Sequence, residues 1–282
     1  MQAVQTNENI FKTIQENFNI VQVAKDLGLL VRKIGSSFRS DSIDISGRGE
    51  NALALYENTN SWFDFMLNIG GDITDLVAHV KFNGDIKEAL HFLMPDASNS
   101  YIDREFKARK AFDDNIERWH NELFNNQRES SVRALEYLHS RGINDDTICA
   151  LKIGVKADET SAGGNRIVFP YWNDAGKKVL YFTTRRYDWL GNGQENEAQP
   201  KYKKASLEHY PFLHNAPMGL NSLSRKKDDT LIITEGVVDW VVCFQEGYSV
   251  LSPNGGDFGK MWKDVLEKVK KFWLFARLFV SL

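Results

Sequence analysis

Two carboxylates follow an apolar segment near the end of the chain. In LIITEGVVDW, Glu235 comes directly after the apolar run, and Asp239 lies about one helical turn further on. Ligands of open parallel sheets bind beyond the carboxyl ends of the strands, so Glu235 would lie where a metal-binding or acid–base carboxylate acts. Gly236 would permit close backbone approach, and Asp239 would lie at the positive end of a helix and could support Glu235. An ordinary turn before an acidic helix start fits the same residues equally well.

Basic residues precede these acids at the ends of predicted strands. Arg166 begins the segment RIVFP, Arg186 ends the segment VLYFTTRR, and Lys201 lies in PKYK. Guanidinium groups bind phosphates through two hydrogen bonds and lysine supplies a point charge, so these side chains are candidates for holding phosphate groups. A solvated basic strand edge is the alternative, and it is the favoured interpretation for Arg185, Lys203 and Lys204.

A further candidate is the turn Asn254-Gly255-Gly256, which follows the segment YSVLSP. Its backbone could approach a phosphate group. A plain tight turn explains the same three residues equally well.

The elements that would position these residues alternate between strand and helix. Residues 231–236, 237–247 and 248–256 predict a strand, a helix, and a strand with a turn, and a helix over 257–270 and a strand over 271–276 follow. This alternation predicts a parallel sheet covered by helices. Before it, a helix over 134–142 precedes strands over 165–172 and 177–186.

The N-terminal part predicts an α+β arrangement. Apolar residues recur at helical spacing over 9–29, and 52–56 and 62–66 alternate apolar and polar residues around a polar turn. These patterns predict a helix and a β-hairpin. Gly70-Gly71 is expected to break the strand that precedes it, and Asp72 and Asp85 are expected to cap two helices.

Composition narrows the class of protein. The 282 residues are 42% hydrophobic and 26% charged, which is typical of a soluble globular protein with two or three domains. No membrane span or secretory signal is expected, so the cytoplasm is the default location. The net charge of −3 argues against coating nucleic acid by bulk charge but allows a local basic groove. Cys149 and Cys243 exclude a disulfide framework and are expected to be buried, reduced thiols.

The order of the segments resembles the catalytic core of bacterial-type DNA primases, which ends in the metal-binding toprim fold shared with topoisomerases. The similar segments cover about half of the chain: ALEYLHSRGI, NRIVFPYWNDAGKKVLYFTTRR, PKYKKAS, and LIITEGVVDW with GYSVLSPNGG. The resemblance implies a DNA primase, a nucleotidyltransferase that makes short RNA primers on single-stranded DNA during replication. It also implies Mg²⁺ or Mn²⁺ as cofactor, and a DNA template, nucleoside triphosphates and a replicative helicase as partners.

The resemblance assigns roles to individual residues. Glu235 matches the glutamate that binds the catalytic metal, and Asp239 would act beside it as a second catalytic carboxylate. The positions that would hold phosphates of template or nucleotide are Arg166, Arg186, Lys201, Asn254 and Gly255.

The N-terminal part resembles the zinc-binding domain of the same enzymes over NIVQVAKDLGLLVRK, SWFDF and GGDITDLVAHV. In the family, cysteines and a histidine hold zinc beside these strands. Here residues 36–40 (SSFRS) replace the first ligand pair and no cysteine precedes Cys149. Hydroxyls are poor zinc ligands, so zinc is not expected. An aromatic core is predicted to stabilise the domain instead, and some of its rings could stack on single-stranded bases. That core comprises Phe38, Tyr56, Trp62, Phe63 and Phe65.

Four parts of an α/β protein are therefore predicted. They are a zinc-free DNA-binding domain over 1–96, a helical linker over 97–131, a primase-core subdomain with a mixed sheet over 132–227, and a partial toprim parallel sheet over 228–282. The missing zinc ligands and the SPNGG turn resemble primases of phages, plasmids or integrated mobile elements more than a housekeeping enzyme.

The chain departs from the family after Glu267. The family's next strand ends in an Asp-x-Asp pair, whereas residues 271–282 (KFWLFARLFVSL) contain no acid. Two-metal phosphoryl transfer needs several converging carboxylates, so the active site is expected to be incomplete, through truncation or frameshift or because the module is naturally inactive. Two other functions stay open: a non-catalytic single-stranded-DNA-binding or replisome-interaction module, and another toprim phosphotransferase or nuclease.

Overall fold

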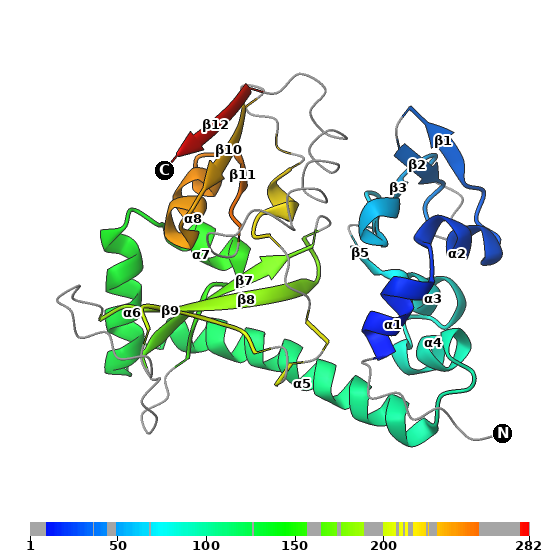
Figure 1. The fold of residues 1–282 in the computed structure, drawn as a ribbon, viewed down its shortest axis with the longest axis horizontal. Helices are drawn as coiled ribbons and strands as arrows, with labels where there is room; N and C mark the ends of the chain where they lie inside the picture. The colour runs from blue at the N-terminus through cyan, green and yellow to red at the C-terminus, as the bar shows by residue number, and fades with distance from the viewer. Residues whose placement is uncertain are drawn as a thin grey trace. The chain divides into compact units, whose positions relative to one another are not determined.

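The computed structural model divides the chain into two compact units. Unit 1 comprises Met1–Lys110 with Asn173–Lys178, and unit 2 comprises Ala111–Trp172 with Val179–Leu282. Helices and both parallel and antiparallel sheets confirm the predicted α/β class (Figure 1). The residues that the structure describes are 10–35, 37–43, 49–67, 69–125, 127–156, 165–173, 176–188, 200–206, 209–210, 212–213, 217–223, 225, 230–253 and 277–281.

In the described residues, unit 1 combines an antiparallel five-stranded sheet of order β1-β2-β3-β4-β5 with helices that flank it in sequence. The predicted hairpin is confirmed as β3 and β4, which pair through a turn that holds a short 3₁₀ helix, η1. The elements are α1 (Ile10–Asn17), α2 (Ile20–Asp26), β1 (Arg32–Ile34), β2 (Ser37–Ser40), β3 (Leu53–Tyr56), η1 (Glu57–Thr59), β4 (Ser61–Asp64), β5 (Ile69–Asp72), α3 (Ile73–Lys81) and α4 (Ile86–Leu93).

The amphipathic segment at the start of unit 1 forms two helices rather than one. Asn19 caps α2, because its side chain accepts hydrogen bonds from the amides of Val21 and Gln22. The side chain of Asn60, in the hairpin turn, bridges the end of α1 and the start of α2. Its amide nitrogen donates to the carbonyl of Phe18, and its oxygen accepts from the amide of Ile20. These bonds satisfy the orphan groups where the two helices meet. The helix periodicity carries no sign of this distant partner.

The expectation that Gly70-Gly71 breaks a strand is wrong, because both glycines lie inside β5. Gly70 pairs with Phe63 across the sheet. A Cβ atom at Gly70 would lie 2.5 Å from the Trp62 carbonyl oxygen and 2.8 Å from the Phe63 ring, so glycine is the residue that fits against β4 here. Asp72 caps α3 and Asp85 caps α4, as predicted.

The aromatic core of unit 1 is smaller than predicted. Trp62 is fully buried and donates a 3.0 Å hydrogen bond from Nε1 to the carbonyl of Asp72, while its ring lies edge-on to His79. Phe65, by contrast, is 56% exposed. Alternate residues of a strand face opposite sides, so Phe63 leaves the core face that Trp62 occupies, and Phe65 lies in the turn after β4.

Asp64 joins two loops of unit 1 from a fully buried position. One carboxylate oxygen accepts from the Ser42 hydroxyl at 2.7 Å and the Ile43 amide at 2.9 Å. The other accepts from the amides of Met66 at 2.9 Å and Leu67 at 3.0 Å. A carboxylate offers about four acceptor positions. All of them are therefore used to hold the segment after β2 against the turn after β4.

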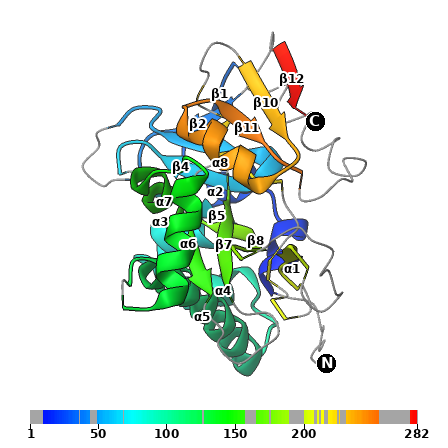
Figure 2. The same ribbon diagram turned by 90° about the vertical axis from the view of Figure 1, so that its left-hand side faces the viewer.

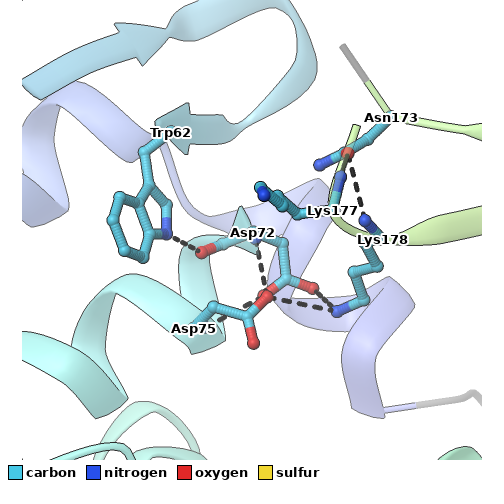
Figure 3. A network of polar contacts seen from close by, with 6 residues as sticks. All are labelled: Trp62, Asp72, Asp75, Asn173, Lys177 and Lys178. Carbon is cyan, nitrogen blue, oxygen red and sulfur yellow. Dashed lines mark hydrogen bonds and ion pairs between the residues drawn. The ribbon is translucent and has the colours of Figure 1, made fainter. Parts of the chain in front are cut away.

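A second buried carboxylate network lies at the start of α3 (Figure 3). Lys178, in the turn that belongs to unit 1, forms an ion pair with Asp72 and lies 3.7 Å from Asp75. Asn173 orders this turn, because its side-chain oxygen accepts from the amides of Lys177 and Lys178. Burial opposes ionisation of Asp72, but Lys178 overcomes it and lowers the pKa of Asp72 to about 2. Burial, and then the charge of Asp72, raises the pKa of Asp75 to about 6.

The strands described in unit 2 form two sheets. One is antiparallel, of order β6-β7-β8-β9, and the other is parallel, of order β11-β10-β12. Helix α5 (Asn99–Leu123) begins in unit 1 and ends in unit 2. The other elements are α6 (Glu129–Ser140), α7 (Asp145–Leu151), β6 (Gly154–Lys156), β7 (Arg166–Trp172), β8 (Val179–Arg186), β9 (Tyr202–Lys204), η2 (Leu220–Ser222), β10 (Thr230–Thr234), α8 (Val237–Gln245), β11 (Ser249–Leu251) and β12 (Arg277–Ser281).

The parallel sheet confirms the predicted strand-helix-strand pattern. β10 is central and pairs in parallel with β11 and β12, and α8 packs against β10 and β11 (Figure 1, Figure 2). Trp240 of α8 is buried and donates from Nε1 to the carbonyl of Val250 at 2.8 Å. The helix predicted over 257–270 and the strand predicted over 271–276 lie outside the described residues.

The two cysteines differ in their exposure to solvent. Cys149 is exposed and not buried as expected, whereas Cys243 is half-buried and burial raises the pKa of its thiol. Cys149 lies on the exposed side of α7, whose buried side is formed by Thr147, Ile148 and Leu151.

None of the helices in the described ranges combines the length and the hydropathy that a membrane span requires.

Candidate functional site

Glu235 lies at the carboxyl end of the central parallel strand. It is the first residue after β10, and its side chain is exposed. Two hydroxyls order the backbone here: the Ser252 hydroxyl donates to the Glu235 carbonyl at 3.2 Å, and that of Thr234 donates to the Gly236 carbonyl at 3.3 Å. Ligands of parallel α/β sheets bind beyond this edge. Glu235 is therefore placed where the sequence pattern predicts a ligand-binding carboxylate, and its role stays a prediction.

Asp239 lies in the first turn of α8, one turn after Glu235. A Cβ atom added to Gly236 would lie 2.8 Å from the Asp239 carboxylate, which shows that this carboxylate lies over the start of the helix. Arg141, which follows α6, has its guanidinium 3.9 Å from the same carboxylate, and both side chains are about half exposed or more. Such an exposed pair is weak, so Asp239 stays accessible. Sequence reasoning did not single out Arg141.

Arg185 is not a solvated strand-edge residue, contrary to the favoured interpretation. Its guanidinium carbon lies 4.3 Å from the ring centre of Tyr137 on α6, and its Nε donates to the Tyr202 hydroxyl at 3.2 Å. The residue is only 9% exposed. Cation–π stacking of a desolvated guanidinium is strongly favourable. The sequence gives no sign that α6 covers this face of β8.

Three cationic residues meet on the antiparallel sheet, and we call Arg166, Arg186 and Lys201 the basic cluster. Arg166 of β7 pairs with Arg186 of β8. The amide of Arg186 donates to the Lys201 carbonyl at 3.0 Å, which brings the third residue alongside. The three predicted phosphate-holding residues of this sheet are therefore brought together.

Arg166 is buried within the basic cluster, at 3% exposure. Its guanidinium donates to the carbonyls of Pro200 and Lys201. Its Nε is also buried and has no hydrogen-bond partner in the part of the chain that the structure describes. Burial, and then the charge of Arg186, lowers the pKa of Arg166. Arg166 thus holds the backbone that carries Lys201, and it adds positive potential to the cluster.

Arg186 is held by a carboxylate two residues away. Its Nε and Nη2 donate to the two oxygens of Asp188, both at 2.9 Å. This hydrogen-bonded pair raises the pKa of Arg186 and lowers that of Asp188. Beyond Lys201, the edge strand β9 exposes Tyr202, Lys203 and Lys204. For the two lysines this agrees with the expected solvated edge.

The described residues do not fit a two-metal site. Among them, no group of three or more histidine, cysteine, aspartate or glutamate side chains is arranged to hold a metal ion. Mg²⁺ prefers six oxygen ligands, and two-metal phosphoryl transfer needs several carboxylates that converge on the two ions. Glu235 and Asp239 are too few for this task. The remaining candidates, Asn254 and Gly255, lie outside the described residues.

No protein-family model and no curated protein sequence matches the chain. Among solved structures, the Aquifex aeolicus primase (zinc-binding and RNA polymerase domains) matches at 20% identity over 98% of this chain and 72% of that one, with a TM-score of 0.48. The RNA polymerase domain of Mycobacterium tuberculosis primase DnaG matches at 15% identity over 62% and 64%, with a TM-score of 0.46.

The catalytic core of E. coli primase matches at 19% identity and a TM-score of 0.42, and the chain spans 59% of that structure. These solved structures are bacterial primase domains, the family that the sequence motifs resemble. Likenesses at TM-scores below 0.5 assign no activity and no site residue to this chain.

Proposed function

We propose that this chain is a primase-type protein that binds single-stranded DNA and nucleotide phosphates at the basic cluster and uses Glu235 in the synthesis of primers. One observation carries the proposal. Unit 2 combines a parallel sheet whose central strand ends at Glu235 with an antiparallel sheet that brings Arg166, Arg186 and Lys201 together. The motifs for both sheets occur in the order that the primase resemblance implies.

The residues of the cluster have different roles in this proposal. Arg186 and Lys201 contact phosphate groups, because a guanidinium binds a phosphate through two hydrogen bonds and an ammonium adds charge. Arg166 is a positioning residue, since its guanidinium is bonded to the backbone at 200–201. Attack of a primer 3′-hydroxyl on the α-phosphate forms the new phosphodiester bond and breaks the bond to the β-phosphate, which leaves as pyrophosphate. Fixed cations nearby stabilise the negative charge on the phosphoryl oxygens and on the leaving group.

Glu235 and Asp239 would contribute ligands for Mg²⁺ or Mn²⁺ in such an enzyme. A replicative helicase as partner, a cytoplasmic location and an origin in a mobile element belong to the same proposal and follow from the resemblance alone.

A second candidate function is a non-catalytic module that binds single-stranded DNA. It is favoured by the small number of acids: the described residues offer only Glu235 and Asp239 at the carboxyl edge of the parallel sheet. This candidate keeps the role of the basic cluster and assigns no reaction to Glu235.

The two functions separate in a paired assay of the intact chain. Labelled nucleotides, single-stranded DNA and Mg²⁺ or Mn²⁺ would report primer synthesis, and fluorescence anisotropy would report DNA binding. The primase function predicts synthesis by the wild type, its loss in Glu235→Gln with unchanged binding, and its retention in Glu136→Gln, an exposed matched control on α6. Binding without synthesis would favour the second candidate, and metal-dependent cleavage of the DNA would favour a nuclease. The absence of both binding and reaction would refute both candidates.

A further inference from the structure

The contact between Arg186 and Asp188 has the geometry of phosphate recognition. The two guanidinium nitrogens and the two carboxylate oxygens form parallel bonds, both 2.9 Å long. An arginine presents the same pair of donors to a phosphate group. Both side chains are shielded, with about a fifth of each exposed to solvent. Asp188 therefore occupies the side of Arg186 that a phosphate would use.

The surroundings of this pair are arranged for an anion. Arg166 lies beside Arg186 across the strands, nearly fully buried, and its Nε has no partner within the described residues. Lys201 is joined to both arginines through its carbonyl. Asp188 forms an ion pair with Arg186. Its charge also opposes part of the lowering of the pKa of Arg166.

We propose that Asp188 occupies the seat of a phosphate group on Arg186, and that a phosphate of the nucleic-acid backbone or of a nucleoside triphosphate displaces it on binding. This inference rests on the proposed function, and it adds a residue that sets the affinity of the basic cluster. Because Asp188 is two residues from Arg186 in sequence, its local concentration is high. A single free phosphate competes poorly with such a neighbour, whereas a ligand with several phosphates gains contacts elsewhere and can displace it.

The pair also explains why the cluster is stable without a ligand. Three cations within one sheet repel one another, and Arg186 contributes to the lowered pKa of Arg166. Asp188 offsets part of this repulsion in the free protein. When a phosphate takes its place, Asp188 moves toward solvent and Arg186 keeps an anionic partner.

The test is a binding comparison with the intact chain and two probes. One probe is a labelled single-stranded oligonucleotide, and the other is ATP, so that the source of the phosphate can be distinguished. The variant is Asp188→Asn, which keeps the shape and one hydrogen-bond acceptor but removes the charge. Asp146→Asn is the matched control, because it removes the same charge from an exposed carboxylate at the start of α7 in the same unit.

We expect Asp188→Asn to bind one or both probes about 3- to 10-fold more tightly than wild type, a gain in the range of an ion pair of this exposure. The logarithmic salt dependence of oligonucleotide binding should stay close to that of the wild type, because a phosphate contacts Arg186 in both complexes. Asp146→Asn should leave both quantities close to wild type. In an Arg186→Gln background, Asp188→Asn should lose its effect, which would assign the gain to this one arginine.

The outcomes separate this inference from the proposed function. If the wild type binds DNA and Asp188→Asn binds no more tightly than Asp146→Asn, the inference is wrong and the proposed function is untouched. If primer synthesis is absent but Asp188→Asn still gains affinity, the phosphate seat stands without the catalytic role. A gain that persists in the Arg186→Gln background overturns the inference, as does the absence of binding in both proteins. Thermal unfolding followed by circular dichroism would show that each variant is folded.

Discussion

Replacing Asp64 with asparagine should destabilise unit 1. The carboxylate is fully buried and accepts four hydrogen bonds, two on each oxygen. An asparagine has the same shape but offers only one acceptor oxygen. Its amide group would therefore face two donors, either those of the 42–43 segment or those of the 66–67 turn.

The magnitude follows from the two bonds that are lost. Hydrogen bonds to a charged group each contribute about 1.5–3 kcal/mol, and a buried donor without a partner adds a desolvation cost. The side chains of Met66 and Leu67 are about 40% exposed, so water can reach part of this turn. We therefore expect a loss near the lower end of the sum, about 3–4 kcal/mol, which corresponds to a fall in melting temperature of roughly 10 °C or more for a unit of this size.

Hydrogen exchange measured by mass spectrometry on the intact chain is the appropriate assay. We expect faster exchange in peptides that contain Ile43, Met66 and Leu67, and a lower melting temperature. Asp26→Asn is the control, because that carboxylate is exposed and accepts from Gln22 at one oxygen. If Asp64→Asn melts within about 2 °C of Asp26→Asn and exchange at the two loops is unchanged, the reasoning about Asp64 is refuted.

Three further predictions concern other contacts. Lys178→Met leaves Asp72 and Asp75 without their cation and should lower the free energy of unfolding by about 3 kcal/mol. Lys177→Met, at an exposed position, should change it by less than about 0.5 kcal/mol. Urea unfolding measures both, and equal effects would contradict the role of Lys178 as the cation of this network. The pKa of Asp75 is raised to about 6 from an ordinary 3.8, so the folded unit holds this proton more tightly: the resulting stability is fully present below about pH 4 and is lost as the pH rises through 6. Asp75→Asn should flatten this part of the curve, and an unchanged pH dependence would show that Asp75 is not its source. Gly219→Ala should lower the free energy of unfolding by about 3 kcal/mol or more, because φ is +107° and the new Cβ would lie 2.0 Å from the Val250 carbonyl. Gly28→Ala, at φ +85° with open space around it, should lower it by about 1 kcal/mol. Similar melting temperatures for the two variants would contradict the steric role of Gly219.

Local patterns in the sequence predict much of the architecture. Asp72 and Asp85 cap the expected helices because capping depends on residues three positions apart. The strand-helix-strand alternation around Glu235 gives the parallel sheet because alternation leaves few topologies. Gly70 shows the limit: a glycine pair suggests a break, yet the Trp62 carbonyl and the Phe63 ring across the sheet leave no room for a side chain.

The candidate site is less predictable because its contacts are tertiary. The residue types of Arg166 and Arg186 indicate phosphate chemistry, but nothing local shows that one guanidinium is buried against a backbone carbonyl. The burial of Arg185 has no local signal in the sequence, because its partner, Tyr137, lies 48 positions earlier on α6. Asp188 is close in sequence, but its contact with Arg186 depends on how the chain turns after β8.

The most direct test of the account measures the affinity of the intact chain for single-stranded DNA across a range of salt concentrations, with the double variant Arg186→Gln/Lys201→Gln beside it. The basic cluster as a phosphate-binding site predicts that the wild type binds, that the double variant binds at least about tenfold more weakly, and that its logarithmic salt slope is shallower by about 1.4, the value for two lost phosphate contacts. Equal affinity and equal slope in the two proteins, or no binding by the wild type, would contradict the account.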